Sequence, residues 1–292
     1  MTMANNLAAW AGILCWALFA FTPWAFATER QRTGDEIIRE ALARHEEHGT
    51  RCEDLTMVLT GPRGERSVRA LKSYFRETTS GEARLLLVVE APSELSGVTL
   101  LVQRQPSGET KSAIYLPAFG KELKGQTQAS APFLDTDFAA TDFLGEAPDA
   151  YRYHLAEDAR IDRIDYWVIA AQPRHEELPP PSGYGQRLIF VRKDTLLIAR
   201  IDYLDGDGRL LKRQTRHDLQ ESEGQSWRAG MVLMEGIALP HQTLLKRSHT
   251  VFAEECAPEE MFSTGMIFAN PRQAEGSEPE EGSGDTPEEA PE

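Results

Sequence analysis

The sequence has few cysteines and few basic residues for its length. Three of its 292 residues are cysteine, and 31 lysines and arginines stand against 46 aspartates and glutamates, a formal net charge of −15. The phosphate backbone of a nucleic acid repels such a chain, and no strong basic cluster interrupts it, so we expect no nucleic-acid partner. The hydrophobic share of 41% is ordinary and supports a sizeable core.

Motifs that mark catalysis are also missing. The sequence contains no G-x-S-x-G elbow, no S-x-x-K pair and no P-loop, and Gly183–Gly185 lacks the third glycine of a dinucleotide-binding motif. His45 and His48 are three residues apart, whereas a zinc-protease helix needs four. The turn at Asp205–Gly208 would put Gln214 at the last ligand position of an EF-hand, where a carboxylate is required. We therefore expect no enzymatic activity, no metal and no cofactor.

The first segment is typical of a secretory signal peptide. Leu7–Phe21 is apolar and uncharged, and Ala25–Ala27 follows as an A-x-A cleavage pattern before the first charge, Glu29. We predict cleavage between Ala27 and Thr28 and a periplasmic mature chain. No basic residue precedes the apolar run, and its length leaves an uncleaved membrane anchor as the alternative.

Export would remove Cys15 and leave an even pair of cysteines, Cys52 and Cys256, in an oxidising compartment. The sequence gives no distance between them, so a bridge and two free thiols both stay open. Our hypothesis is that they form a disulfide.

The far end of the chain is acidic. After Arg272 there is no lysine or arginine, and eight acidic residues follow among glycine, proline and serine. A segment without large apolar residues cannot bury enough surface to offset the entropy of ordering. We predict a disordered tail.

Between these ends, one helix precedes many strands. Thr33 and Glu36 form a capping box, and apolar residues from Ile37 to Leu42 fall on one face of a helix predicted over Thr33–His48. The hydrophobic period then becomes two, with turn residues between the runs, which predicts about ten or eleven strands in antiparallel hairpin order. Strand candidates lie at 54–60, 66–76, 85–89, 98–105, 110–116, 151–155, 161–170, 186–192, 197–203, 209–219 and 242–252.

A long sheet with one apolar face curls and needs a cover. The amphipathic helix supplies part of it, and Leu134–Leu144 is expected to supply more, which leaves an apolar cavity beneath the cover. The expected ligand-binding residues are Leu42, Leu86, Val88, Leu101, Ile114, Phe133, Phe138, Leu197 and Ile201. Which face of each strand points inward stays open, since a shift of one residue exchanges the whole set.

Asp135, Asp137 and Asp142 form the one tight group of carboxylates in the sequence. Paired carboxylates can do acid–base chemistry, and they can equally cap a short helix. We favour capping, with Asp137 and Asp142 fixing a short lid segment.

A series of short motifs runs along the chain: Gly97 after Pro92, Tyr115 and Pro117 in Ile114–Pro117, Asp137 and Asp142 in Phe133–Phe143, Tyr151–Tyr153, Tyr184 and Asp205–Lys212. These stretches resemble the outer-membrane lipoprotein-sorting family in its LolA-like branch. They run in family order over Asp54–Phe252. Two positions depart from the pattern: Asp135 stands where a glycine is usual, and Phe119–Glu122 replaces an arginine-rich stretch.

The resemblance implies a mainly β fold, a strongly curved antiparallel half-barrel with a few α-helices as a lid over an apolar cavity. It implies carriage of a lipid or a lipoprotein acyl chain, and a membrane partner, since this branch often accompanies RND-type exporters. The expected organisation is a signal peptide at 1–27, a carrier domain at 28–272, expected to be monomeric, and an acidic tail at 273–292. The alternatives are a structural adaptor of an envelope complex with a filled core, and an exported hydrolase.

Overall fold

The computed structural model describes residues 32–45, 49–78, 80–107, 109–117, 131–145, 148–174, 183–221, 226–238 and 240–263. By its contacts the chain divides into Met1–Gln31 and Arg32–Glu292, and the structure described below belongs to the second unit. The expected cleavage site at Ala27–Thr28 and the tail at 273–292 lie outside the described residues.

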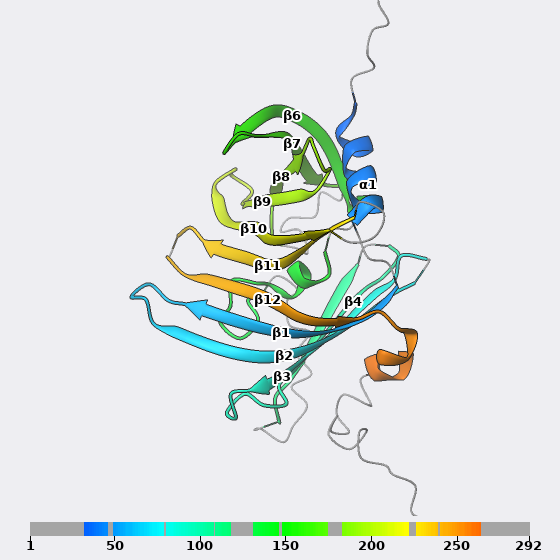
Figure 1. Cartoon of the computed structure of the whole chain (residues 1–292), viewed down its shortest axis with the longest axis vertical. Helices are drawn as coiled ribbons and strands as arrows, with labels where there is room; N and C mark the ends of the chain where they lie inside the picture. Colours follow the sequence, from blue (N-terminus) through cyan, green and yellow to red (C-terminus); the bar gives the residue numbers. More distant parts are fainter. Residues whose placement is uncertain are drawn as a thin grey trace, which may run out of the picture. The chain divides into compact units, whose positions relative to one another are not determined.

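The fold is one twelve-stranded antiparallel sheet (Figure 1). The strands are β1 (Thr50–Thr60), β2 (Arg66–Glu77), β3 (Ala83–Ala91), β4 (Thr99–Arg104), β5 (Thr110–Tyr115), β6 (Tyr151–Ile161), β7 (Ile164–Pro173), β8 (Gln186–Arg192), β9 (Ile198–Leu204), β10 (Leu210–Glu221), β11 (Trp227–Gly236) and β12 (Gln242–Val251). Their spatial order is β5-β4-β3-β2-β1-β12-β11-β10-β9-β8-β7-β6. The sheet curves strongly without closing, and the expectation of a mainly β, curved antiparallel fold is confirmed.

The sequence patterns missed one strand, β11. Its residues Trp227–Gly236 do not alternate cleanly between apolar and polar, and Gly230 interrupts the run. The backbone nevertheless pairs with β10 on one side and β12 on the other. Pairing with two neighbours therefore outweighs a weak local preference, and the sheet has twelve strands instead of ten or eleven.

The described residues contain one α-helix, α1 (Gly34–His45), where a few were expected. The predicted capping box is confirmed, because the Thr33 amide donates to the Glu36 carboxylate and the Glu36 amide donates to Thr33 Oγ1. The apolar face of α1, from Ile37 to Leu42, is buried, and the helix packs on β6 and β8. Residues 46–48 of the predicted helix lie outside the described part of the chain.

The second expected cover is a looped segment with one short 3-10 helix, η2 (Ala140–Phe143). We call residues 131–145 the cover segment. Leu134 and Asp135 have φ of 47° and 60°, in the left-handed region that a right-handed helix excludes. Asp135 thus occupies a backbone conformation that glycine adopts most easily, which accounts for the glycine expected there.

Apolar side chains pack on both faces of the sheet. The face toward α1 and the cover segment, here called the inner face, carries the main core, including Leu85, Leu87, Phe138 and Ile189. A second cluster on the outer face joins Leu86 and Leu101 to Ala257 and Phe262 near the end of the described chain. The expected inner-face set had the register of β3 and β4 reversed, because these two strands are apolar on both faces.

Residues 253–263, which we call the C-terminal strap, lie against that outer cluster. Cys256 in the strap is bonded to Cys52 of β1, with the two Cα atoms 6.1 Å apart. Arg76 pairs with Glu254 at 2.9 Å, and Arg84 pairs with Glu259 at 3.2 Å. The disulfide and two ion pairs together hold the strap on the sheet.

Candidate functional site

Asp137 anchors the middle of the cover segment to β12. Its carboxylate accepts a hydrogen bond from Thr243 Oγ1 at 2.7 Å and lies 2.8 Å from Nδ1 of His241. Its amide donates to Thr243 Oγ1 at 3.0 Å, and its carbonyl accepts from Lys212 at 2.9 Å. These contacts fix the segment across the inner face of the sheet.

Asp142 anchors the end of the cover segment to β10. Its side chain is fully buried and pairs with Lys212 at 2.6 Å. The Tyr184 hydroxyl and the Ala139 amide also donate to the carboxylate, at 3.1 and 2.7 Å. Burial raises the pKa of the Tyr184 hydroxyl, and the Asp142 charge raises it further, so the hydroxyl keeps its proton as a donor. Both aspartates thus make contacts that hold the segment on the sheet.

The aromatic rings of the cover segment stack on one another. Phe138 and Phe143 are parallel with centroids 5.1 Å apart, and Phe133 meets Phe143 edge to face at 6.1 Å. Phe133 and Phe138 are buried in the main core, whereas Phe143 lines a cavity. The segment therefore fills much of the inner face and leaves one hollow at its end.

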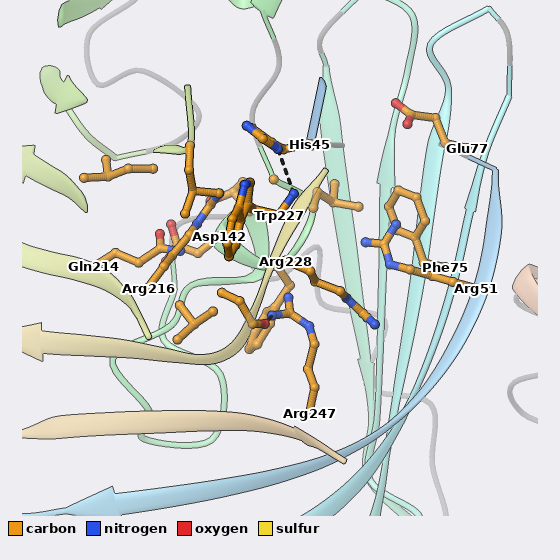
Figure 2. A pocket seen from close by; sticks show the side chains of 18 of the residues that line it. His45, Arg51, Phe75, Glu77, Asp142, Gln214, Arg216, Trp227, Arg228 and Arg247 are labelled. Atoms are coloured by element: carbon orange, nitrogen blue, oxygen red, sulfur yellow. Dashed lines mark hydrogen bonds between the residues drawn. The ribbon is translucent and has the colours of Figure 1, made fainter. Parts of the chain in front are cut away.

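That cavity has a volume of about 170 Å³ and lies between the sheet, the end of α1 and residues 141–145 (Figure 2). Its apolar wall includes Phe75, Leu144, Leu197, Ile201 and Val232, together with the Trp227 ring. The rest of its wall is strongly polar, so this is not the apolar cavity that was expected.

Six arginines line the cavity: Arg51, Arg104, Arg187, Arg216, Arg228 and Arg247. Glu77 and Asp142 are the carboxylates that line it among the described residues. Glu77 pairs with Arg104 at 3.3 Å, and Asp142 pairs with Lys212 as described above. Among the described residues, arginines therefore outnumber carboxylates in this wall, in a protein whose net charge is strongly negative.

One buried carboxylate behind the wall organises three of these arginines. Glu53 accepts a hydrogen bond from Arg228 and lies 3.1 Å from Arg247 and 3.6 Å from Arg51. Its side chain is 5% exposed, so the charges interact through a weakly screening medium.

His45 closes the cavity at the end of α1. Nδ1 accepts a hydrogen bond from the Trp227 amide at 3.0 Å, so the proton resides on Nε2, which donates to the Thr195 carbonyl at 2.7 Å. Burial lowers the pKa of His45; the bond to Thr195 opposes this, and the charges of Arg44 and Arg216 lower it further. A neutral imidazole thus ties α1 to the turn between β8 and β9 and to the start of β11.

The structure brings few of the expected ligand-binding residues to the cavity. Leu197 and Ile201 line it, whereas Leu42, Ile114, Phe133 and Phe138 pack in or against the main core. The remaining three, Leu86, Val88 and Leu101, belong to the outer cluster under the strap.

The other motif positions shape the backbone. Gly97 has φ of 85°, and a Cβ there would approach Pro117 Cγ to 3.0 Å, which explains why a glycine accompanies that proline. Tyr115 packs against the outer cluster.

No cluster of histidine, cysteine or acidic residues suited to a metal ion occurs in the described ranges. No helix among these residues is long and apolar enough to cross a membrane.

The arginine lining was missed because it leaves no local signal in the sequence. Each of the six arginines belongs to a different strand, and between Arg51 and Arg247 they are spread over most of the chain. The curvature of the sheet brings them together. The sequence signal that could have predicted the lining is the recurrence of an arginine at an inner-face position on several strands.

A family model described as "Uncharacterized protein" matches residues 81–267. A search of the curated proteins finds no match for this chain. Solved structures, in contrast, match over most of the sequence.

A putative outer membrane lipoprotein-sorting protein domain from Vibrio parahaemolyticus has a TM-score of 0.72 at 23% identity, over 80% of this chain and 98% of that chain. A DUF1329 family protein from Desulfovibrio piger has a TM-score of 0.70 at 22% identity, over 80% and 97%. A LolA superfamily protein from Nitrosomonas europaea has a TM-score of 0.65 at 15% identity, over 80% and 99%. The likeness expected from the sequence motifs is thus confirmed for the fold.

Proposed function

The chain belongs to the family whose model matches residues 81–267, and from this membership and its LolA superfamily fold we propose that it is a periplasmic carrier of a lipid or lipid-like ligand. The observation that carries the proposal is the construction of the inner face. A separate segment, tied down by polar contacts, covers that face and leaves a hollow at its end.

The size of the cavity indicates how a ligand would enter. Its volume of about 170 Å³ is smaller than the roughly 300–1,000 Å³ of most small-molecule sites. An acyl chain therefore needs the cover segment to move, and Phe143 is the side chain it would displace first, since Phe143 lines the cavity and stacks on Phe138. Each methylene of the chain then contributes about 0.8 kcal/mol on burial.

Binding without chemistry is the simplest use of this site. The buried carboxylates Asp137 and Asp142 already make hydrogen bonds and an ion pair that hold the cover segment, which supports a structural role for both. A hydrolase is the less favoured candidate. A structural adaptor remains the nearest competitor, because the main core of the sheet is well filled.

The wider setting of the carrier is part of the proposal. We infer that residues 1–27 direct export and that the ligand passes between envelope components. The similarity to lipoprotein-sorting proteins supports a lipid or lipoprotein ligand. The sequence resemblance supports an RND-type exporter as a membrane partner, and we propose that the carrier is a monomer.

The test is lipid extraction followed by binding. Protein purified from the envelope should release lipid that mass spectrometry detects, and it should bind a fluorescent fatty acid or phospholipid saturably. Phe143→Glu places a charge in the cavity wall and should weaken binding about tenfold or more. Val68→Glu is the control, since that side chain is 57% exposed and does not line the cavity. Lack of saturable binding by the wild type across several lipid classes would leave the adaptor ahead.

A further inference from the structure

We propose that the cavity recognises the anionic headgroup of an amphiphile, a carboxylate or a phosphate on an apolar chain. This inference rests on the proposed carrier function and specifies the class of its ligand. It is carried by the arginine lining, which an apolar ligand alone does not require.

The lining arginines converge from six separate strands. Arg51, Arg104, Arg187, Arg216, Arg228 and Arg247 belong in that order to β1, β4, β8, β10, β11 and β12. Figure 2 labels four of them around the hollow, with the Arg51 guanidinium 3.7 Å from the centre of the Phe75 ring. A planar guanidinium offers paired N–H donors that match the two oxygens of a carboxylate or phosphate. Six such groups around one cavity form a surface suited to an anion.

Acidic groups also lie at the site. Arg51, Arg228 and Arg247 all approach the buried carboxylate of Glu53. Of the two carboxylates among the described lining residues, Glu77 pairs with Arg104 and Asp142 pairs with Lys212, which lies outside the lining set. Among the described residues that line the cavity, guanidinium groups therefore outnumber carboxylates by six to two.

Two of these cations are held where water reaches them little. Arg187 is 6% exposed and Arg104 is 8% exposed. Arg187 lies over the rings of Tyr151, Tyr184 and Tyr203, with its guanidinium carbon 4.6 to 5.5 Å from their centres. Arg104 also pairs with Glu77 at 3.3 Å. An anion that binds the folded chain at these groups should stabilise the fold by mass action.

The shape of the cavity assigns the two ends of the ligand. Its volume of about 170 Å³ suits a headgroup better than a complete lipid. Phe143, Leu144 and Trp227 form an apolar wall beside the arginines, where the cover segment meets the sheet. The headgroup therefore lies against the guanidinium groups, and the chain extends along the path that the cover segment vacates.

The experiment compares ligands that differ only in the headgroup. The purified mature chain is titrated with dodecanoate, dodecanol, dodecyl phosphate and inorganic phosphate, and binding and thermal stabilisation are measured. The variants are Arg216→Gln and Arg51→Gln, from two different strands, with Arg216→Lys keeping the charge. Arg209→Gln is the matched control, because its side chain is 78% exposed on a turn. Thermal melts without ligand verify that each variant folds.

We expect dodecanoate and dodecyl phosphate to bind the wild type about tenfold or more tightly than dodecanol. Either glutamine variant should reduce binding of the two anionic amphiphiles by about tenfold and leave dodecanol unchanged, while Arg209→Gln changes neither. Inorganic phosphate alone should bind about a hundredfold more weakly than dodecyl phosphate, because it lacks the chain.

Three results would overturn the proposal, and they are distinguishable. Equal binding of dodecanoate and dodecanol, with no effect of either glutamine variant, removes the headgroup site and leaves the carrier function standing. Inorganic phosphate that binds as tightly as dodecyl phosphate makes the cavity a site for a free anion. Failure of every amphiphile to bind the wild type removes the carrier function itself.

Discussion

Asp142 shows how much of the site depends on single buried side chains. Its carboxylate collects donors from the cover segment, from β10 and from the Tyr184 loop, and none of its surface is exposed. The Phe133–Phe143 motif identified this aspartate from the sequence, but its partner Lys212 lies in a separate motif. Asp142 and a structural role for it could therefore be predicted from the sequence, whereas its ion pair with Lys212 could be found only in the folded structure.

Asp142→Asn should destabilise the protein by about 3–5 kcal/mol, because the buried Lys212 ammonium loses its partner. Urea unfolding followed by circular dichroism measures the change. Asp207→Asn, at a side chain 74% exposed, is the control and should have little effect. Unchanged melting of Asp142→Asn, together with loss of a defined hydrolytic activity, would instead favour the hydrolase.

His45 should make stability depend on pH. Its pKa in the folded state is lowered by burial, whereas the unfolded chain has the ordinary value of about 6.5. The unfolded state therefore binds the proton more readily. Stability is fully present above that ordinary value and is lost as the pH falls below it toward the folded value. The free energy of unfolding of the wild type, measured across this pH range, should therefore decrease as the pH falls.

The variant His45→Gln should flatten that slope, since it removes the titrating group. His249→Gln, on an exposed position of β12, should keep the slope of the wild type. Identical slopes for all three proteins would assign the effect to other groups.

At the scale of elements, the cover segment and the C-terminal strap occupy opposite faces of the sheet. The sequence predicted a cover at Leu134–Leu144 from its apolar and motif residues, and the structure has a cover there. The strap was not foreseen, because a few residues such as Ala257 and Phe262 carry no period of their own. These strap residues complete the outer cluster on β3 and β4. The sequence of β3 had already indicated a strand that is apolar on both faces.

Cys52→Ser with Cys256→Ser should loosen the strap and lower stability by up to about 5 kcal/mol in the chain-entropy account of a long loop. The exposed outer cluster should then bind a hydrophobic dye. Reducing the wild type should reproduce both effects, and reducing the double variant should add nothing. Two free thiols in the native protein under denaturing, non-reducing labelling would rule the bridge out.

At the scale of the whole molecule, period-two alternation predicted about ten or eleven strands in antiparallel order, and the length of the one-sided apolar sheet predicted its curvature. It gave no register where both faces are apolar, as at Leu86 and Val88, because alternation then has no polar partner to mark the outside. It also missed the cationic cavity. Side chains such as Arg51 and Arg216 meet only through the curvature of the complete sheet.

The proposed domain boundary predicts that removing residues 273–292 leaves folding intact. The segment holds eight acidic residues and no large apolar side chain, so its loss should change the free energy of unfolding by no more than about 0.5 kcal/mol. The truncated chain should elute earlier from an anion exchanger than the chain that keeps its tail, because it has lost eight acidic residues and no basic residue. A drop in melting temperature would show that the tail packs on the domain.

The strand order also means that the connection from β5 to β6 links the two edges of the sheet. β5 and β6 follow one another in the chain, yet they form the two opposite edges of the sheet. The residues between them, which include the cover segment, must therefore reach from one edge to the other. A chain extends by at most about 3.6 Å per residue, so the length of this connection limits how far the edges can spread. Deleting residues from this connection would reduce the largest distance between the two edges, and the shorter connection would limit the thickness of the ligand that the sheet can enclose.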